Sequence, residues 1–345
     1  MKVALAQIEV KLGYPKENVA RIKECIEAAR DAKRSLIVFS EMCIGGYLLG
    51  DLYTDDDYCK ELMRYGDEVR KASKDITIAF GNVYLDENNV GTDGRRPRRY
   101  NAVYVYTNRK PAQRWHVKLD KWVPPGLVFK TNLPTYRFFD DYRYFASLAD
   151  IAREKNDVAL EYLYSPFLIS DMRKACYPIG FELCEDLWCN DYLYCNADRT
   201  KAVLSPARIL VTNGAVMIVN LSASPWTYGK NAARDRRVKE ANLGVPYLYS
   251  NAVRVENNGK NIITFDGDSA VYGADGKPKI LTKAPYKEEL IVVDHDNIPT
   301  KTAKRKRRPE IAEKYDAIIH GLRLFAGNKV VIGLSGGVDS SVVAG

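Results

Sequence analysis

The sequence has few of the residues from which metal centres and disulfide frameworks are built. Its 345 residues include three histidines, which are far apart: His116, His295 and His320. This distribution disfavours a His-rich metal site and a Ser–His–Asp triad, and no metal is expected. The seven cysteines are an odd number scattered through a large chain, which favours a reducing cytoplasm over a disulfide framework.

Long apolar runs are also missing. No uninterrupted apolar stretch approaches the roughly 20 residues that a membrane-spanning helix needs. The first residues, MKVALAQIEVKLGYPKEN, contain one early lysine and an alternating pattern without the apolar core of a signal peptide. The sequence therefore predicts a cytoplasmic protein that does not bind membranes.

The excess positive charge is concentrated in two short clusters. The chain carries 52 basic and 44 acidic residues, a net charge of +8. One cluster is Arg95, Arg96, Arg98 and Arg99, and the other runs from Lys304 to Arg308; without these nine, 43 basic residues face 44 acidic ones. We interpret the clusters as a solvated loop and a linker, and expect no nucleic-acid partner; a nucleic-acid patch is the weaker alternative.

Segments of strand and helix type alternate over most of the chain. The length suggests two domains of roughly 100–200 residues each. Apolar residues at helical spacing follow Pro15 and recur over 145–155. Strands are predicted at 2–9, 35–41, 76–85, 100–107, 177–184, 214–222, 246–253, 261–272 and 288–294. This alternation predicts an α/β layered domain over residues 1–295, a basic linker over 296–309 and a new unit over 310–345.

Three residues with reactive side chains stand out in or near these segments. Glu41 ends the apolar run SLIVFSE, Cys184 ends YPIGFELC, and Lys130 lies between them in sequence. A carboxylate near a thiol can act as its general base, and an ammonium can lower the thiol pKa and stabilise an oxyanion. Each alone has an ordinary alternative, because a glutamate at a strand end is commonly capped and a cysteine there is commonly inert core.

The segments around these residues form an ordered set of motifs. They are SEMCIGGYLLGDL (40–52), KTNLPTYRFFDDYRYF (130–145), FELCEDLW (181–188) and NLSASPWTYGK (220–230). Together they resemble the nitrilase superfamily, and more narrowly the glutaminase domains of the glutamine-dependent NAD⁺ synthetases. The resemblance covers residues 1–295, where FDGDSAVYGADG (265–276) is similar to a late hairpin of that family, and it implies an α-β-β-α sandwich.

The resemblance implies a catalytic triad of Glu41, Lys130 and Cys184. Cys184 would attack the side-chain carboxamide of L-glutamine, form a thioester and release ammonia, with Glu41 as the base. Lys130 and the backbone N–H of Glu185 would hold the oxyanion, and Asp141 would support the triad. The implied glutamine contacts are Tyr47, Tyr136, Trp188, Ser224 and Lys230. The alternative for the aromatic members is core packing.

The sequence departs from the family pattern in several places. Lys118 in HVKLDKW competes with Lys130, which we prefer because the LPTY motif follows it. Asp141 stands where the family usually has the longer glutamate. Lys230 stands where some relatives have an arginine, and a lysine cannot reproduce a planar bidentate fork. Glu185 and Asp186 have a structural alternative as favourable charges at a helix N-terminus. Cys184, Cys189 and Cys195 lack the spacing of a zinc site.

A second motif, SGGVDSS (335–341), follows the apolar run 330–334, which is predicted to be a strand. Glycines let backbone amides approach a phosphate, hydroxyls donate hydrogen bonds, and a following helix adds positive potential. The motif resembles the PP-loop of ATP pyrophosphatases and lacks the GK[ST] of a Walker A loop. Its implied ATP-binding residues are Ser335, Gly336, Gly337, Asp339 and Ser340, with Mg²⁺ accompanying ATP; the glutaminase step would need no cofactor. The alternative is a generic glycine-rich turn.

The order of the two motif sets is that of the glutamine-dependent NAD⁺ synthetases. In that family, ammonia from the first site displaces AMP from adenylated deamido-NAD⁺ at the second, and the proteins are homo-oligomers. Because the chain stops within the helix after the loop, we expect it to be part of a longer protein and to act alone at most as a glutaminase. The alternatives are a stand-alone nitrilase-type amidase or carbamoylase, and a non-catalytic binding protein.

Overall fold

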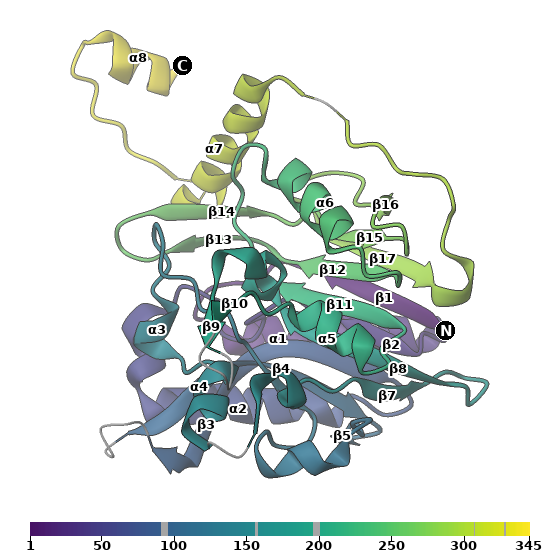
Figure 1. Cartoon of the computed structure of the whole chain (residues 1–345). Helices are drawn as coiled ribbons and strands as arrows, with labels where there is room; N and C mark the ends of the chain where they lie inside the picture. The colour runs from purple at the N-terminus through teal and green to yellow at the C-terminus, as the bar shows by residue number, and fades with distance from the viewer. Residues whose placement is uncertain (91–95, 156–157, 196–200, 307, 328) are drawn as a thin grey trace.

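Two β-sheets that face one another form the centre of the molecule (Figure 1). The structure is a computed structural model that describes residues 1–90, 96–155, 158–195, 201–306, 308–327 and 329–345. The first sheet has the strand order β17-β1-β2-β3-β4-β5, with β6 paired to β4, and its β1, β2 and β3 are parallel. These strands are β1 (Lys2–Gln7), β2 (Leu36–Val38), β3 (Thr77–Val90), β4 (Pro97–Thr107), β5 (Lys110–Pro111), β6 (Leu127–Phe129) and β17 (Glu289–Asp294).

The second sheet has the order β16-β15-β12-β11-β8-β7, with β8, β11 and β12 parallel. Its strands are β7 (Phe167–Ser170), β8 (Cys176–Leu183), β11 (Met217–Ser222), β12 (Tyr247–Asn251), β15 (Ala270–Tyr272) and β16 (Pro278–Leu281). Two short ribbons complete the strands: β9 (Tyr194–Cys195) with β10 (Lys201–Ala202), and β13 (Val253–Asn257) with β14 (Ile262–Asp266).

The side-chain alternation of each strand divides the core into an inner and an outer layer. On β1, Val3 and Leu5 belong to the cluster between the sheets, whereas Ala4 and Ala6 face the helices. On β11, Val219 belongs to the same inner cluster. Successive side chains of a strand point to opposite faces of its sheet. Because both faces are covered here, one strand contributes apolar side chains to the inner layer and to the outer layer.

Helices cover the outer faces and give an α-β-β-α order of layers (Figure 1). Helix α1 (Pro15–Asp31) and helix α2 (Asp56–Lys71) cover the first sheet, and α5 (Pro206–Thr212) and α6 (Lys230–Ala241) cover the second. The smaller elements are α3 (Asp141–Tyr144), α4 (Leu148–Lys155), η1 (Gly50–Thr54), η2 (Val117–Lys121), η3 (Leu160–Leu163), η4 (Cys184–Asp191) and η5 (His295–Asn297). The predicted α/β layered class is confirmed.

Two predicted strands each divide between different sheets. The segment 246–253 forms β12 in the second sheet and the start of β13 in the separate ribbon. The segment 261–272 likewise divides into β14 and β15 at Gly267, whose φ of 75° is the left-handed conformation that favours glycine. A run of strand-forming residues does not reveal where a chain passes from one sheet to another. Strand propensity depends on the local residue types, whereas strand pairing depends on segments that are distant in sequence.

The interpretation of the first basic cluster as a solvated loop is wrong for Arg98 and Arg99. Both lie on β4 and are 8% exposed. Arg98 is paired with Glu154 and Arg99 with Asp56. These arginines are structural ion pairs, and Arg95 lies outside the described residues.

The second basic cluster is also partly paired. Arg305 contacts Asp235 and Asp268, and Arg308 contacts Asp316. Arg307 lies outside the described residues. These carboxylates hold two of the basic side chains against the molecule, so the charge is partly neutralised locally.

The last part of the chain consists of two helices, α7 (Glu310–Ala326) and α8 (Val338–Ala344). Helix α7 packs on the β13–β14 ribbon, where Gly321 faces Thr264, and α8 lies apart from the two sheets (Figure 1). The predicted strand at 330–334 is wrong, because this segment is extended and exposed and pairs with none of the described strands. A strand needs a partner, and none is supplied here. No described helix combines the length and apolarity that crossing a membrane requires.

The inner core can be tested at Phe181, which lies on β8 and is 1% exposed. We expect Phe181→Ala to lower the free energy of unfolding by about 3–5 kcal/mol, because it leaves a cavity between the two sheets. The control Phe325→Ala, at a side chain that is 54% exposed, should change it by less than about 0.5 kcal/mol. Urea unfolding followed by circular dichroism measures both, and equal shifts would contradict this description of the core.

Candidate active site

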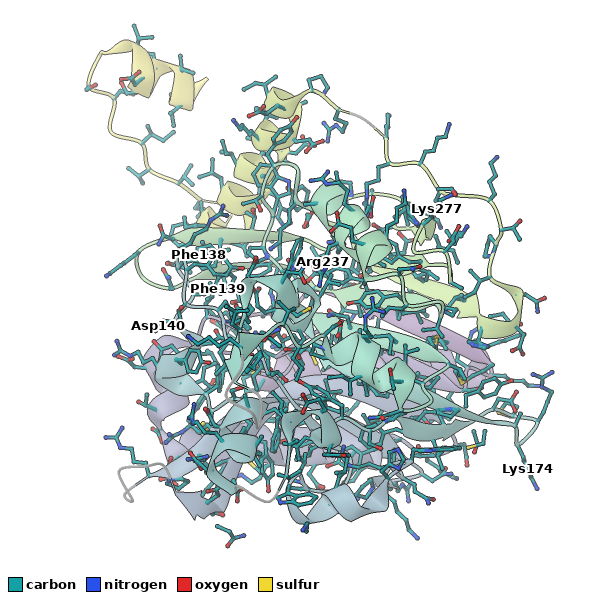
Figure 2. All side chains as sticks on the ribbon, viewed as in Figure 1. Phe138, Phe139, Asp140, Lys174, Arg237 and Lys277 are labelled. Atoms are coloured by element: carbon teal, nitrogen blue, oxygen red, sulfur yellow. The ribbon has the colours of Figure 1, made fainter. Side chains whose placement is uncertain are left out.

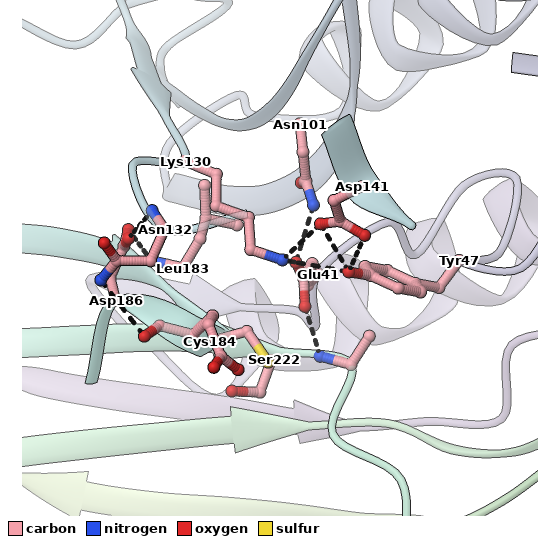
Figure 3. Close-up of polar contacts among 12 residues, drawn as sticks. Glu41, Tyr47, Asn101, Lys130, Asn132, Asp141, Leu183, Cys184, Asp186 and Ser222 are labelled. Atoms are coloured by element: carbon pink, nitrogen blue, oxygen red, sulfur yellow. Dashed lines mark hydrogen bonds and ion pairs between the residues drawn. The ribbon is translucent and has the colours of Figure 1, made fainter. Parts of the chain in front are cut away.

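The ends of strands from both sheets deliver the three predicted triad residues to one place (Figure 3). Glu41 follows β2, Lys130 directly follows β6, and Cys184 directly follows β8. The backbone N–H of Lys130 donates to the carbonyl of Asn101 on β4, which holds the start of its loop against the first sheet. Sheet register therefore sets the positions from which these side chains approach one another.

The ammonium of Lys130 lies among two carboxylates and a phenol (Figure 3). Its Nζ is 2.9 Å from Glu41 Oε1, 3.0 Å from Asp141 Oδ2 and 3.1 Å from the Tyr47 hydroxyl. Glu41 and Lys130 are fully buried. The side chain of Lys118 lies outside the described part of the chain, so its position cannot be compared with that of Lys130. The assignment of Lys130 as the triad lysine is therefore supported by the contacts of Lys130 alone.

Asp141 reaches this cluster despite being shorter than the expected glutamate. The Tyr47 hydroxyl is 2.7 Å from each Asp141 carboxylate oxygen and donates to this carboxylate. Helix α3 begins at Asp141, directly beside the Lys130 loop, because Asp141 N donates to Pro134 O at 3.1 Å. The shorter side chain of Asp141 therefore still reaches Lys130 and Tyr47.

Charge–charge interactions keep the lysine protonated. Burial acts to lower the pKa of Lys130, but Asp141 and then Glu41 outweigh it and raise that pKa above its ordinary value. Burial raises the pKa of Asp141, while Lys130 and the Tyr47 hydroxyl act in the opposite direction. Burial and the neighbouring Asp141 also raise the pKa of Tyr47, which therefore remains a neutral donor.

Both carboxylate oxygens of Glu41 have further donors. Asn101 Nδ2 donates to Oε1 at 2.7 Å, and the backbone N–H of Ala223 donates to Oε2 at 2.7 Å. The sequence analysis missed both. Asn101 had a signal, because it is a polar residue within the apolar segment YNAVYVYT, whereas a backbone donor such as Ala223 has none. These bonds fix the orientation of the carboxylate.

Cys184 lies at a sharp turn where β8 ends and η4 begins. Its φ is 36°, in the left-handed region where a non-glycine residue is strained. Burial raises the pKa of its thiol, Glu41 raises it further, and Lys130 lowers it. Figure 3 shows Cys184 beside Glu41 and Lys130, and the raised pKa of its thiol keeps it protonated at neutral pH.

Asp186 connects the cysteine turn to the lysine loop (Figure 3). Its Oδ2 accepts from Leu183 N at 3.2 Å, which caps the N-terminus of η4. Its Oδ1 accepts from Thr131 N at 3.1 Å and Asn132 N at 2.8 Å. Asp186 therefore lies at a helix N-terminus as expected, but burial raises the pKa of its carboxyl to about 8, so the favourable charge remains a prediction.

A pocket of about 730 Å³ opens beside Glu185. The predicted residues Tyr136, Trp188 and Lys230 line it, and the Tyr136 hydroxyl donates to Glu185 at 3.0 Å. Its other lining residues include Phe138, Phe139, Asp191, Pro225, Tyr228 and Arg236. Phe138 and Phe139 lie together on one wall, with ring centroids 4.5 Å apart (Figure 2). Ser224 is buried next to Pro225 and does not line the pocket, and Tyr47 lies in the lysine cluster.

The residues of the second motif are not brought to this site. Ser335, Gly336, Gly337 and Asp339 are exposed around the start of α8. Ser335 Oγ lies 3.1 Å from Ser340 Oγ, and Gly336 has a φ of 81°. The described side chains contain no group of three or more His, Cys, Asp or Glu placed to hold a metal, and that of Cys195 lies outside them.

A comparison with protein families matches residues 2–302 to the carbon-nitrogen hydrolases. The chain belongs to the carbon-nitrogen hydrolase family. This assignment agrees with the nitrilase-like fold, since that match spans both sheets and every strand end of the site.

The chain is similar to longer proteins that are named glutamine-dependent NAD(+) synthetases. It is 27% identical to the glutamine-dependent NAD(+) synthetase of Synechocystis sp. over 99% of this chain and 56% of that protein. It is also 27% identical to the Thermotoga maritima protein of the same name, over 100% of this chain and 57% of that one. The chain therefore spans little more than half the length of these relatives.

Solved structures share the fold of this carbon-nitrogen hydrolase. The glutamine-dependent NAD+ synthetase from Acinetobacter baumannii superimposes with a TM-score of 0.72 at 24% identity, covering 99% of this chain and 56% of that one. An amidase of the nitrilase superfamily from Nesterenkonia superimposes with a TM-score of 0.59 at 14% identity, covering 85% of this chain and 90% of that one.

The raised thiol pKa of Cys184 predicts a pH dependence of alkylation in this carbon-nitrogen hydrolase. Because the pKa lies above its ordinary value, the thiolate fraction should increase about tenfold per pH unit between pH 7 and 9. Mass spectrometry after iodoacetamide treatment measures the rate at each cysteine, with the exposed Cys176 as control. At pH 7 Cys184 should react more slowly than Cys176. A Cys184 rate that levels off near pH 6 would contradict the prediction.

Proposed function

We propose that this chain is the glutamine-hydrolysing part of a glutamine-dependent NAD⁺ synthetase, with Cys184 as nucleophile. The observation that carries the proposal is the buried Lys130 ammonium, held between Glu41 and Asp141 and acting on the thiol of Cys184. The relatives over almost the whole chain are named glutamine-dependent NAD(+) synthetases, which supports the choice of glutamine. The fold alone would also suit an amidase.

The first half-reaction forms a thioester. Glu41 removes the thiol proton as Cys184 Sγ attacks the carboxamide carbon, and the carbonyl electron pair moves to the oxygen. Lys130 and the N–H of Glu185 stabilise this oxyanion; as the second residue of η4, Glu185 has an N–H without an intrahelical acceptor. Glu41 then gives its proton to the nitrogen, the C–N bond breaks, and ammonia leaves.

The second half-reaction regenerates the enzyme. Glu41 takes a proton from water as the water oxygen attacks the thioester carbon, and the thiolate leaves and regains its proton, giving glutamate. A nucleophilic cysteine is known in the Nesterenkonia amidase, whose structure shows covalent addition of the acetamide moiety of fluoroacetamide at the active site cysteine. That adduct is an alkylated cysteine and supports the nucleophile, not the thioester itself. In this chain Cys184 is the proposed nucleophile and Glu41 the proposed base.

Lys230 is the proposed partner of the glutamine α-carboxylate. It begins α6 and lines the pocket, and its Nζ makes a long hydrogen bond of 3.5 Å to Pro225 O. Burial lowers the pKa of Lys230, while Cys184 and Glu185 act to raise it. An incoming carboxylate would replace a weak contact with a charge-assisted one. Tyr136 and Trp188 would flank the side chain of the substrate.

The SGGVDSS loop is proposed to bind ATP in the longer protein. The hydroxyls of the exposed Ser335 and the half-buried Ser340 and the backbone of Gly336 and Gly337 have the donor chemistry that phosphates need. The described residues supply no acidic cluster for Mg²⁺, so we derive no step through a metal. Deamido-NAD⁺ as the ammonia acceptor, homo-oligomeric assembly, cytoplasmic location and the domain limits remain predictions.

The nucleophile and the lysine can be tested by ammonia release from L-glutamine. Cys184→Ala should lower kcat by more than about 10³-fold, because no thioester can form. Lys130→Met should lower kcat by more than about 10²-fold, since it removes an oxyanion donor and leaves two buried carboxylates without their cation. Cys176→Ala, at an exposed cysteine, and Lys118→Met should have kcat values close to wild type.

The outcome separates the candidate functions. Retained activity in Cys184→Ala would eliminate the proposed nucleophile, and Lys118→Met as the inactive lysine variant would reverse the assignment. Hydrolysis of simple amides but not of glutamine would favour the amidase alternative. In the longer protein, Cys184→Ala should lose NAD⁺ formation from glutamine with ATP and deamido-NAD⁺ but keep NAD⁺ formation from added ammonia.

The role of Lys230 predicts a specific kinetic change. Lys230→Met should raise KM for glutamine about tenfold with little change in kcat, because it removes a contact made equally in the ground and transition states. Lys239→Met, on the exposed side of the same helix, is the matched control. A simple amide without an α-carboxylate should be hydrolysed equally by both variants, and an equal KM increase for that amide would disprove the assignment.

A further inference from the structure

The segment 41–48 begins with the proposed base and ends beside Tyr47. It leaves β2 through Met42, whose φ of 48° is in the left-handed region, and passes Gly46 at a φ of 96°. A non-glycine residue in that conformation is strained and persists only where surrounding contacts hold it. The geometry of Glu41 and Tyr47 therefore depends on what holds the two ends of this segment.

Two residues of β13 hold those ends. Glu256 accepts from both backbone N–H groups at the far end, with Oε1 3.0 Å from Tyr47 N and Oε2 2.7 Å from Leu48 N. Arg254 Nη2 donates to the carbonyl of Glu41 at 3.4 Å. Residues two apart on a strand point to the same face, so Arg254 and Glu256 reach the same segment together.

The pair is buried in a way that is costly for stability. Arg254 is 0% and Glu256 is 1% exposed, and Arg254 Nη1 lies 3.1 Å from Glu256 Oε1. Arg254 Nε has no hydrogen-bond partner among the described residues, and the guanidinium lies over the Phe265 ring at 4.8 Å. Apolar side chains of similar volume commonly stabilise a core as well as a buried ion pair does. Stability alone therefore does not account for two charges at this position.

We propose that Arg254 and Glu256 are positioning residues for hydrolysis, a role that rests on the proposed function. Glu256 sets the backbone of Tyr47, and through it the hydroxyl that bonds Asp141 and Lys130. Arg254 sets the backbone of Glu41. Both side chains are buried, and their hydrogen bonds go to the backbone of segment 41–48, so we assign them a positioning role.

The test uses Glu256→Gln, which keeps the size of the side chain and one acceptor oxygen. We expect kcat for glutamine to decrease about tenfold with KM unchanged, because a small misplacement of the reacting groups lowers the rate steeply. Arg254→Lys keeps the charge and should lower kcat several-fold. The control is Glu154→Gln, which alters another arginine–carboxylate pair, between Arg98 of β4 and Glu154 of α4, and should leave kcat unchanged.

A double-mutant cycle separates positioning from general destabilisation. If Glu256 acts through Tyr47, adding Glu256→Gln to Tyr47→Phe should lower kcat by less than twofold further. Adding Glu154→Gln to Tyr47→Phe should have no effect. The proposal would be overturned if the fold-decreases in kcat caused by Glu256→Gln and Tyr47→Phe multiply in the double variant. A kcat loss in Glu154→Gln equal to that in Glu256→Gln would also overturn it.

Hydrogen exchange provides a readout that needs no activity. In Glu256→Gln the amides of residues 41–48 should exchange at least about tenfold faster, since Tyr47 and Leu48 lose a charged acceptor. If the wild type releases no ammonia, the proposed function fails and exchange alone decides this inference. Unchanged exchange of this segment would then overturn it.

Discussion

The site depends on the buried ammonium of Lys130. One cation lies between the carboxylates of Glu41 and Asp141, and the Tyr47 hydroxyl completes its contacts. A cation so deeply buried is tolerated only when its charge and its hydrogen-bonding capacity are satisfied. The pair of carboxylates in turn needs the lysine, because two adjacent negative charges at this depth would repel. Two segments distant in sequence, 41–47 and 130–141, are thus held by one electrostatic arrangement, and a change to any member disturbs the others.

The two sheets contribute different parts of this arrangement. The first sheet supplies Glu41 and Lys130, and the second supplies Cys184 together with the backbone donor of Ala223, which follows β11. The distance from base to thiol is therefore set by how closely the sheets pack. Asp186 adds a direct connection between the cysteine turn and the lysine loop. The apolar layer between the sheets is consequently part of the catalytic geometry as well as of the stability.

Much of the fold could be predicted because the signals of apolar strands are local, whereas the proposed triad came from the resemblance of four ordered motifs to a known family. Apolar strands are recognisable from their residues, and Glu41 and Cys184 stand at their ends. The burial of Arg99 could not be predicted, because its partner Asp56 is 43 residues away in sequence and only the fold brings them together. The segment 330–334 was predicted as a strand from composition, but a strand exists only with a partner. The sequence analysis also missed Glu256, because Glu256 accepts hydrogen bonds from the backbone of Tyr47 and Leu48, which are distant in sequence.

The raised pKa of the Cys184 thiol changes the role of the base. A cysteine with a lowered pKa is already a thiolate and reacts with oxidants and alkylating agents as readily as with substrate. Here burial and the charge of Glu41 keep the proton on sulfur. In the proposed mechanism the thiolate therefore forms only when an acceptor for the proton and an electrophile are both aligned. Glu41, with both oxygens held by donors, is oriented for that transfer before substrate arrives. In the proposed mechanism the reactivity of Cys184 depends on the orientation of Glu41, which is why we expect contacts to the backbone of segment 41–48 to affect the rate of the chemical step.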